Sequence, residues 1–97
     1  MARYVSLLNW TDQGIRNVKD TVNRANAVRQ VFKAGGGKII DIYWTLGQHD
    51  VVLISEAPDD ETAIRLVLSL GMKGNVRTST MRAFGEQEMA RIVQGLS

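Results

Sequence analysis

Three consecutive glycines, Gly35 to Gly37, separate a helical pattern from a strand pattern early in this sequence. Before them, apolar residues recur at steps of three and four from Asp12 to Ala34, which predicts one amphipathic helix with a basic outer face. Glycine adopts the left-handed conformation that ends helices at little steric cost, so we expect the helix to stop there. The run that follows, from Lys38 to Thr45, is rich in β-branched and aromatic residues and predicts a strand.

The remaining segments predict a defined order of strands and helices. In addition to the two elements above, the pattern predicts a strand over Arg3–Trp10 and a strand over His49–Ala57 that forms a hairpin at Gly47. Pro58 breaks this strand, Asp59 is a cap-type residue, and Asp60 and Glu61 are acids in the first turn of a helix that runs to about Leu70. A strand over Asn75–Phe84 and a helix over Gly85–Leu96 follow. This βαββαβ order with a C-terminal helix predicts an α+β, ferredoxin-like fold with a four-stranded antiparallel sheet. A chain of 97 residues predicts a single domain, residues 1–97.

Composition removes several classes of chemistry. The chain has no cysteine and one histidine, so we expect no disulfide, no metal site and no cofactor. We see neither a bilayer-length apolar run nor a leader, and therefore expect a cytoplasmic protein without membrane contact. The net charge of +2 is spread along the chain, and His49–Ala57 lacks the aromatic residues of an RNA-recognition strand. Nucleic acid is therefore not an expected partner.

Alternation along the predicted strands sorts their residues onto two faces of the sheet. We expect the helices to cover the more uniformly apolar set, which comprises Val5, Leu7, Ile40, Ile42, Trp44, Val52, Ile54, Met81 and Ala83. The complementary set mixes apolar, aromatic and polar side chains and is predicted to lie on the open face: Tyr4, Ser6, Leu8, Trp10, Asp41, Tyr43, Thr45, His49, Val51, Leu53, Ser55, Thr78, Thr80 and Arg82.

An open face that carries large apolar side chains predicts self-association. Burying one large apolar side chain stabilises the folded or associated state by roughly 1.5 to 3 kcal/mol. A face that leaves several of them in water loses this stabilisation for each one. We therefore predict a homodimer in which two sheets face one another and enclose a mixed polar and apolar space. The alternative is a monomer whose C-terminal helix folds over this face.

Three segments in the same order, YVSLLNWTDQGI, YWTLGQHDVVLISEAPDDE and GNVRTSTMRAF, resemble the GYD domain family, small prokaryotic proteins of unassigned activity. The resemblance covers nearly all of the chain and implies one GYD-like domain with a ferredoxin-like fold of the dimeric α/β-barrel type. One position departs from the family. The segment that gives the family its name reads Gly47, Gln48, His49 and Asp50 here, so its tyrosine is replaced and a role for that tyrosine would not carry over.

Two functional hypotheses follow from these residues. The first is a non-catalytic ligand-binding or assembly module that associates with itself, as a homodimer or a higher oligomer, and binds a small molecule. Its candidate ligand-binding residues all belong to the set predicted on the open face: Tyr4, Ser6, Trp10, Tyr43, Thr45, His49, Thr78 and Arg82. The alternative is a cofactor-independent oxygenase or isomerase in which His49 is the candidate catalytic proton acceptor, because an imidazole can move a proton near neutral pH. Asp50 cannot orient His49 there, since adjacent strand residues point to opposite faces.

The length of the loop at Gly47 decides which aromatic residue accompanies His49. With a two-residue loop, Trp44 and His49 share a face, whereas with a three-residue loop Tyr43 and His49 do, because a one-residue shift swaps the faces. The uniformly apolar set requires the second arrangement. We therefore predict that Trp44 is in the core, that Tyr43 and His49 look into the dimer, and that Asp50 holds the turn.

Overall fold

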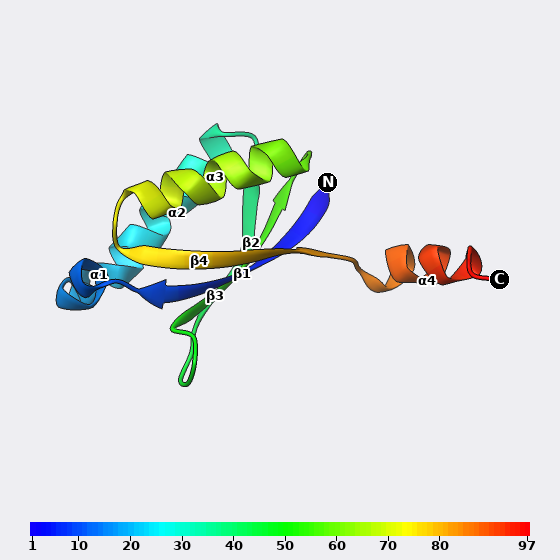
Figure 1. Cartoon of the computed structure of the whole chain (residues 1–97). Coiled ribbons are helices and arrows are strands. Elements are labelled where there is room, and N and C mark those ends of the chain that lie inside the picture. Colours follow the sequence, from blue (N-terminus) through cyan, green and yellow to red (C-terminus); the bar gives the residue numbers. More distant parts are fainter.

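The computed structural model describes residues 1–97 and confirms the predicted order of elements. The elements are β1 (Ala2–Trp10), α1 (Asp12–Arg16), the 3₁₀ turn η1 (Val18–Asp20), α2 (Thr21–Ala34), β2 (Lys38–Trp44), β3 (Val51–Ala57), α3 (Asp60–Met72), β4 (Val76–Ala83) and α4 (Glu86–Gln94). The four strands form one antiparallel sheet in the order β2-β3-β1-β4. Figure 1 shows α2 and α3 on one face of this sheet, so the α+β, ferredoxin-like fold is confirmed.

The continuous helix predicted over residues 12–34 is wrong, because the chain divides it into α1, η1 and α2. Thr11 caps α1 by accepting the Gly14 backbone N–H on its hydroxyl oxygen at 3.1 Å. Asn17 then leaves the helical conformation with φ −107° and ψ 23°, and its side-chain amide donates to the Gln13 carbonyl at 3.0 Å. The chain therefore turns through η1 before α2 begins at Thr21.

The predicted helix boundaries at Gly35 and Asp59 are confirmed. Helix α2 ends at Ala34, and Gly36 follows in the left-handed region with φ +92°. Asp59 caps α3, because its carboxylate accepts the Thr62 backbone N–H at 2.8 Å. Local side-chain chemistry is enough to place both boundaries.

The hydrophobic core lies between the sheet and the two covering helices. It comprises Leu8, Ile39, Val51, Leu53 and Val76 from the strands, Val28 and Phe32 from α2, and Leu66 from α3, with a smaller cluster of Tyr4, Ala57 and Ala63 beside it. Two serines, Ser6 and Ser55, are also buried on this face, and the Ser6 hydroxyl lies 2.8 Å from the Thr80 hydroxyl. Every buried side-chain polar atom has a hydrogen-bond partner.

The helices cover the face that the sequence predicts to be open. Tyr4, Ser6, Trp10, Thr78 and Arg82 therefore lie on the helix side of the sheet, and their predicted place on the open face is wrong. The reason is that alternation separates two faces but does not say which one the helices take. In β1 and β3, both sets of alternating residues contain large apolar side chains. The more uniformly apolar set therefore does not identify the face that the helices cover.

The hairpin between β2 and β3 is longer than predicted. Trp44 pairs with Val51, and the loop Thr45–Asp50 is closed by a hydrogen bond from the Thr45 backbone N–H to the Asp50 carbonyl at 2.8 Å. A bulge between residues 39 and 41 shifts the register of β2. The expected two- or three-residue loop is thus wrong. Trp44 lies on the helix side and Tyr43 on the open side, as predicted. Trp44 is however 44% exposed and lies outside the core cluster, so its predicted place in the core is wrong.

Helix α4 projects away from the rest of the chain (Figure 1). None of its residues is buried, and the molecule extends over 52 × 31 × 17 Å. The alternative of a C-terminal helix that folds over the open face of the sheet is therefore wrong. None of the helices combines the length and apolar content that a membrane crossing requires.

The close approach of α1 to the segment before β4 gives a test of the fold. A Cβ at Gly14 would lie 1.9 Å from the Asn75 carbonyl oxygen, so Gly14→Ala should lower the free energy of unfolding by about 2 kcal/mol. At Gly71, inside α3, a Cβ meets no atom within 4 Å. Gly71→Ala should therefore raise the free energy of unfolding by about 0.5 kcal/mol. Urea denaturation of both variants measures the difference, and equal effects of the two substitutions would contradict the placement of α1.

Candidate functional site

The sheet face opposite α2 and α3 carries a continuous apolar patch. Its members are neighbours across the strands: Val5 pairs with Ile54 and with Met81, and Leu7 pairs with Val52. None of them belongs to the buried core, and Met81 is 47% exposed. We call these five residues the open-face patch.

Polar groups frame the open-face patch at both ends. At one end the Arg3 guanidinium lies 3.0 Å from the Glu56 carboxylate. At the other end, beyond Leu7 in β1, the Asn9 side chain contacts His49. Tyr43, which pairs with Val52, is 56% exposed at the side of the patch. An apolar centre inside a polar rim is the arrangement found in protein–protein interfaces.

His49 lies in the loop Thr45–Asp50, next to the open face. Its Nδ1 is 2.9 Å from the Asn9 side-chain oxygen, an acceptor, so Nδ1 carries the proton in this arrangement. The Thr45 hydroxyl donates to the His49 carbonyl at 2.6 Å. The Asp50 carboxylate accepts the Trp10 backbone N–H at 2.9 Å, and its own backbone N–H donates to the Leu8 carbonyl. Asp50 thus ties the turn to β1, as predicted, and His49 is oriented by an amide.

The eight predicted ligand-binding residues do not gather around one space. Tyr43 and His49 lie on the open side, and Thr45 lies in the exposed loop. The other five, Tyr4, Ser6, Trp10, Thr78 and Arg82, lie on the helix side, where Tyr4 and Ser6 are buried. Trp10 lines an apolar cavity on that side, together with Trp44.

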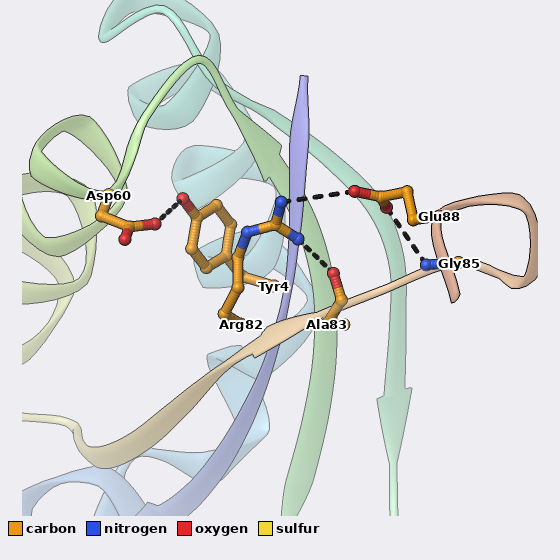
Figure 2. A network of polar contacts seen from close by, with 6 residues as sticks. All are labelled: Tyr4, Asp60, Arg82, Ala83, Gly85 and Glu88. Atoms are coloured by element: carbon orange, nitrogen blue, oxygen red, sulfur yellow. Dashed lines mark hydrogen bonds and ion pairs between the residues drawn. The ribbon is translucent and has the colours of Figure 1, made fainter. Parts of the chain in front are cut away.

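A polar network joins β1 to α3 and β4 (Figure 2). The Tyr4 hydroxyl donates to the Asp60 carboxylate at 2.5 Å, and the Arg82 guanidinium carbon lies 5.8 Å from the centre of the Tyr4 ring. Burial raises the pKa of Tyr4 to about 12, and the hydrogen bond to Asp60 and the negative charge of that carboxylate act in the same direction. The sequence predicts Asp60 only as a first-turn acid. Its contact with Tyr4 spans 56 positions and follows from the fold alone.

Arg82 extends this network to the start of α4 (Figure 2). Its guanidinium lies 3.4 Å from the Glu88 carboxylate, donates to the Ala83 carbonyl and stands 4.5 Å from the centre of the Phe84 ring. Glu88 also accepts the Gly85 backbone N–H at 3.1 Å. This bond, with Arg82 beside it, holds the pKa of Glu88 below its ordinary value. These contacts attach the first turn of α4 to the end of β4.

The projecting helix presents a second apolar surface. Met89, Ile92 and Val93 lie on one side of α4, Leu96 follows shortly after the helix ends at Gln94, and each of these four residues is at least 45% exposed. We call these four residues the α4 stripe. A helix of nine residues is marginal in water on its own and in proteins gains most of its stability from packing. The α4 stripe is therefore available to another molecule.

Comparison with known proteins identifies relatives over nearly the whole chain. The family model described as GYD domain matches residues 4–93. A protein of Thermus thermophilus, named glutamine synthetase and cystathionine beta-lyase binding protein, is 31% identical over 84 residues, which cover 86% of this chain and 88% of the relative.

Two solved structures share the fold. MtbAldR (Rv2779c) superposes with a TM-score of 0.69 at 16% identity over 88% of this chain, and the chain spans 52%, about half, of the length of MtbAldR. TTHA0845 from Thermus thermophilus superposes with a TM-score of 0.52 at 23% identity, over 88% of this chain and 95% of that chain. At these identities the likeness concerns the fold alone.

The raised pKa of Tyr4 predicts a loss of stability at alkaline pH. Because the folded chain raises this pKa from 10.0 to about 12, the native state holds the phenolic proton more tightly than the unfolded chain does. The resulting stabilisation is fully present below pH 10 and is lost as the pH rises towards 12. We expect Tyr4→Phe to flatten this fall in the free energy of unfolding. At neutral pH it should cost about 1 kcal/mol through the lost hydrogen bond.

Tyr43→Phe is the matched control, because it removes the other tyrosine of the chain, at an exposed position on the open face. Urea denaturation between about pH 8 and pH 12 measures all three proteins. If the free energy of unfolding still falls at alkaline pH in Tyr4→Phe but no longer falls in Tyr43→Phe, the role of the Tyr4–Asp60 contact is contradicted.

Proposed function

The chain belongs to the GYD domain family, and we propose that it is a non-catalytic binding module that assembles with a second copy of itself and holds a protein partner. The observation that carries this proposal is the open-face patch, five cross-strand neighbours on a sheet face that no helix of the chain covers. Exposed apolar patches framed by polar residues mark interaction surfaces. The alternative, chemistry at His49, has no comparable support, because the only hydrogen bond of the imidazole is to the Asn9 side-chain amide and no nucleophile or carboxylate contacts it.

The size of the sheet favours a second copy of the chain as the occupant of the open-face patch. Four strands about 4.8 Å apart, each rising about 3.3 Å per residue over some eight residues, give a face of roughly 500 Å². Two such faces together reach about 1,000 Å², which is the lower limit for a specific interface. Tyr43, His49 and the Arg3–Glu56 pair would then lie at the rim of the dimer interface.

The α4 stripe suits a different occupant, a protein partner. An amphipathic helix that lays its apolar face into a groove is a recurrent mode of protein recognition. Helix α4 extends away from the sheet, so a dimer formed through the open-face patch would carry two such helices free for binding (Figure 1). Glu86, Glu88 and Arg91 on the helix keep its other side polar.

The name of the Thermus thermophilus relative supports the class of partner. That protein is named for binding glutamine synthetase and cystathionine β-lyase, and it is 31% identical to this chain. We propose that this chain likewise binds metabolic enzymes of that class, with the α4 stripe as the contact. The chain then acts as a regulatory or adaptor module for the enzymes that it binds.

Leu7→Glu tests self-association through the open-face patch. We expect the wild-type chain to be a dimer at micromolar concentration and Leu7→Glu to be a monomer, because the dimer would have to bury two carboxylates against an apolar surface. Desolvation costs several kcal/mol per ion, which raises the dissociation constant at least about 100-fold. Light scattering after size-exclusion chromatography measures the mass.

Leu68→Glu is the control for this experiment. Leu68 lies on α3, outside the open-face patch, and is 60% exposed. The same change of residue there should leave the dimer intact. A wild-type monomer, or equal masses for the two variants, would refute the proposed interface. Circular dichroism establishes that both variants fold.

Ile92→Asp tests the assignment of the α4 stripe to a protein partner. We expect it to weaken binding to glutamine synthetase or cystathionine β-lyase of the same organism at least about tenfold, because burial of one isoleucine stabilises by roughly 1.5 to 3 kcal/mol. Biolayer interferometry with the immobilised enzyme measures this change. The mass of the dimer should not change.

Gln87→Asp introduces the same residue on the polar side of α4 and should bind as the wild type does. If Ile92→Asp lowers the mass of the dimer, the α4 stripe belongs to the self-association interface and the assignment is wrong. If neither enzyme binds the wild-type chain, the proposed partner class is wrong.

A further inference from the structure

An apolar cavity of about 110 Å³ lies on the helix side of the sheet, apart from both surfaces described above. Leu8, Val51 and Leu53 line it from β1 and β3, Val28 lines it from α2, and Leu70 from α3. Eleven of its fifteen lining residues are hydrophobic. An unfilled apolar space of this kind weakens the packing around it, so occupation by an apolar group would stabilise the fold.

Both tryptophans of the chain line this cavity. The Trp44 indole N–H donates to the Thr21 hydroxyl at 2.9 Å, which connects the end of β2 to the first residue of α2. Trp44 is 44% exposed, so it stands at the rim and the cavity opens to solvent beside it. A small molecule can therefore enter without unfolding of the sheet.

The side chains that line the cavity include two positively charged residues, Arg24 and Lys73, and no aspartate or glutamate. The ion pairs of the chain join Arg3 to Glu56, Arg65 to Glu61 and Arg82 to Glu88, so neither of these cations has an acidic partner. Arg24 is held in place by hydrogen bonds to the carbonyls of Asn17 at 2.6 Å and Gly14 at 3.3 Å. Its guanidinium carbon lies 5.8 Å from the centre of the Trp10 ring.

We propose that this cavity binds a small apolar carboxylate, with its hydrocarbon part among Leu8, Val28 and Leu53 and its carboxylate beside Arg24. An arginine already oriented by two carbonyls retains N–H donors for an anion, and guanidinium–carboxylate hydrogen bonds are charge-assisted. Trp10 and Trp44 would cover the ligand at the mouth of the cavity. An amino group finds no acidic partner among the lining residues, so the cavity selects acids that carry no ammonium.

The volume of the cavity limits the hydrocarbon part of the ligand. A dry cavity of about 150 Å³ in another protein accommodates benzene, and the cavity here is somewhat smaller. A phenyl ring that protrudes partly at the open mouth, or a branched alkyl group of four or five carbons, therefore fits. Longer fatty acids exceed the space.

Three compounds that share a phenyl ring and a two-carbon chain test the charge of the ligand. Phenylacetate is the anion, 2-phenylethanol the neutral analogue and 2-phenylethylamine the cation. Because both tryptophans line the cavity, their fluorescence reports binding directly. We expect a saturable change with phenylacetate at a dissociation constant of about 1 mM or below, at least about tenfold weaker binding of the alcohol and none of the amine.

Variants distinguish a built site from non-specific quenching. Arg24→Met keeps an unbranched stem but removes the guanidinium and its charge, and it should bind phenylacetate only as well as the alcohol. Ala25→Leu fills the cavity from α2 and should abolish binding of both compounds. Ala34→Leu is its matched control, since Ala34 is exposed in the same helix and does not line the cavity, and this variant should bind as the wild type does.

Equal responses to the anion, the alcohol and the amine would overturn the proposal, as would wild-type binding by Arg24→Met or by Ala25→Leu. Arg24 also bonds to two carbonyls near α1, so Lys73→Met provides a second test of charge, and it should weaken phenylacetate binding while alcohol binding stays the same. The dimer mass and enzyme binding do not depend on this cavity. If phenylacetate does not bind, the proposal for the cavity is wrong, and the proposals for the open-face patch and the α4 stripe are not affected.

Discussion

Both sides of the central β1 and β3 pair are apolar, and most of the structure depends on this constraint. Helices α2 and α3 cover the side that carries Leu8 and Leu53, which become the core. The other side keeps Val5, Leu7 and Ile54 without cover. Helix α4 follows β4 and extends away from the sheet (Figure 1). Apolar surfaces left open in this way are typical of interaction sites, and the proposed function rests on them.

The sequence predicts the order of elements and the helix boundaries because local chemistry determines them. Asp59 caps α3 through the backbone of Thr62, and Gly36 adopts the positive φ that a helix end requires. The position of α1 beside the segment before β4 has a different origin. Gly14 lies against the Asn75 carbonyl, 61 positions away, so this contact exists only in the folded chain. Pattern analysis over a window of a few turns has no access to it.

The candidate site is less predictable from the sequence. Which residues share a face of the sheet depends on the pairing register of each strand. A one-residue change in strand phase moves every side chain to the other face, and both faces here are apolar enough to be a core. The bulge in β2 and the loop Thr45–Asp50 shift the register further. Tyr43 consequently lies on the predicted face, whereas Tyr4 and Arg82 lie on the opposite one. Trp10 and Trp44 converge on one cavity although 34 positions separate them, and no local signal indicates this.

The antiparallel pairing of β1 and β4 keeps the three surfaces apart. Arg3, near the start of β1, pairs with Ala83 at the end of β4 that leads to α4. Trp10, at the other end of β1, pairs with Val76 at the start of β4, and both residues line the cavity. The cavity and the α4 stripe therefore lie at opposite ends of the same two strands, and the open-face patch lies between them on the other face. Arg82 links the buried Tyr4 ring to Glu88 and so orients α4 from the sheet itself, without packing of the helix against its own chain. The proposed dimer, its two helical arms and two small ligands are thus compatible, because no two of the proposed contacts use the same side chains.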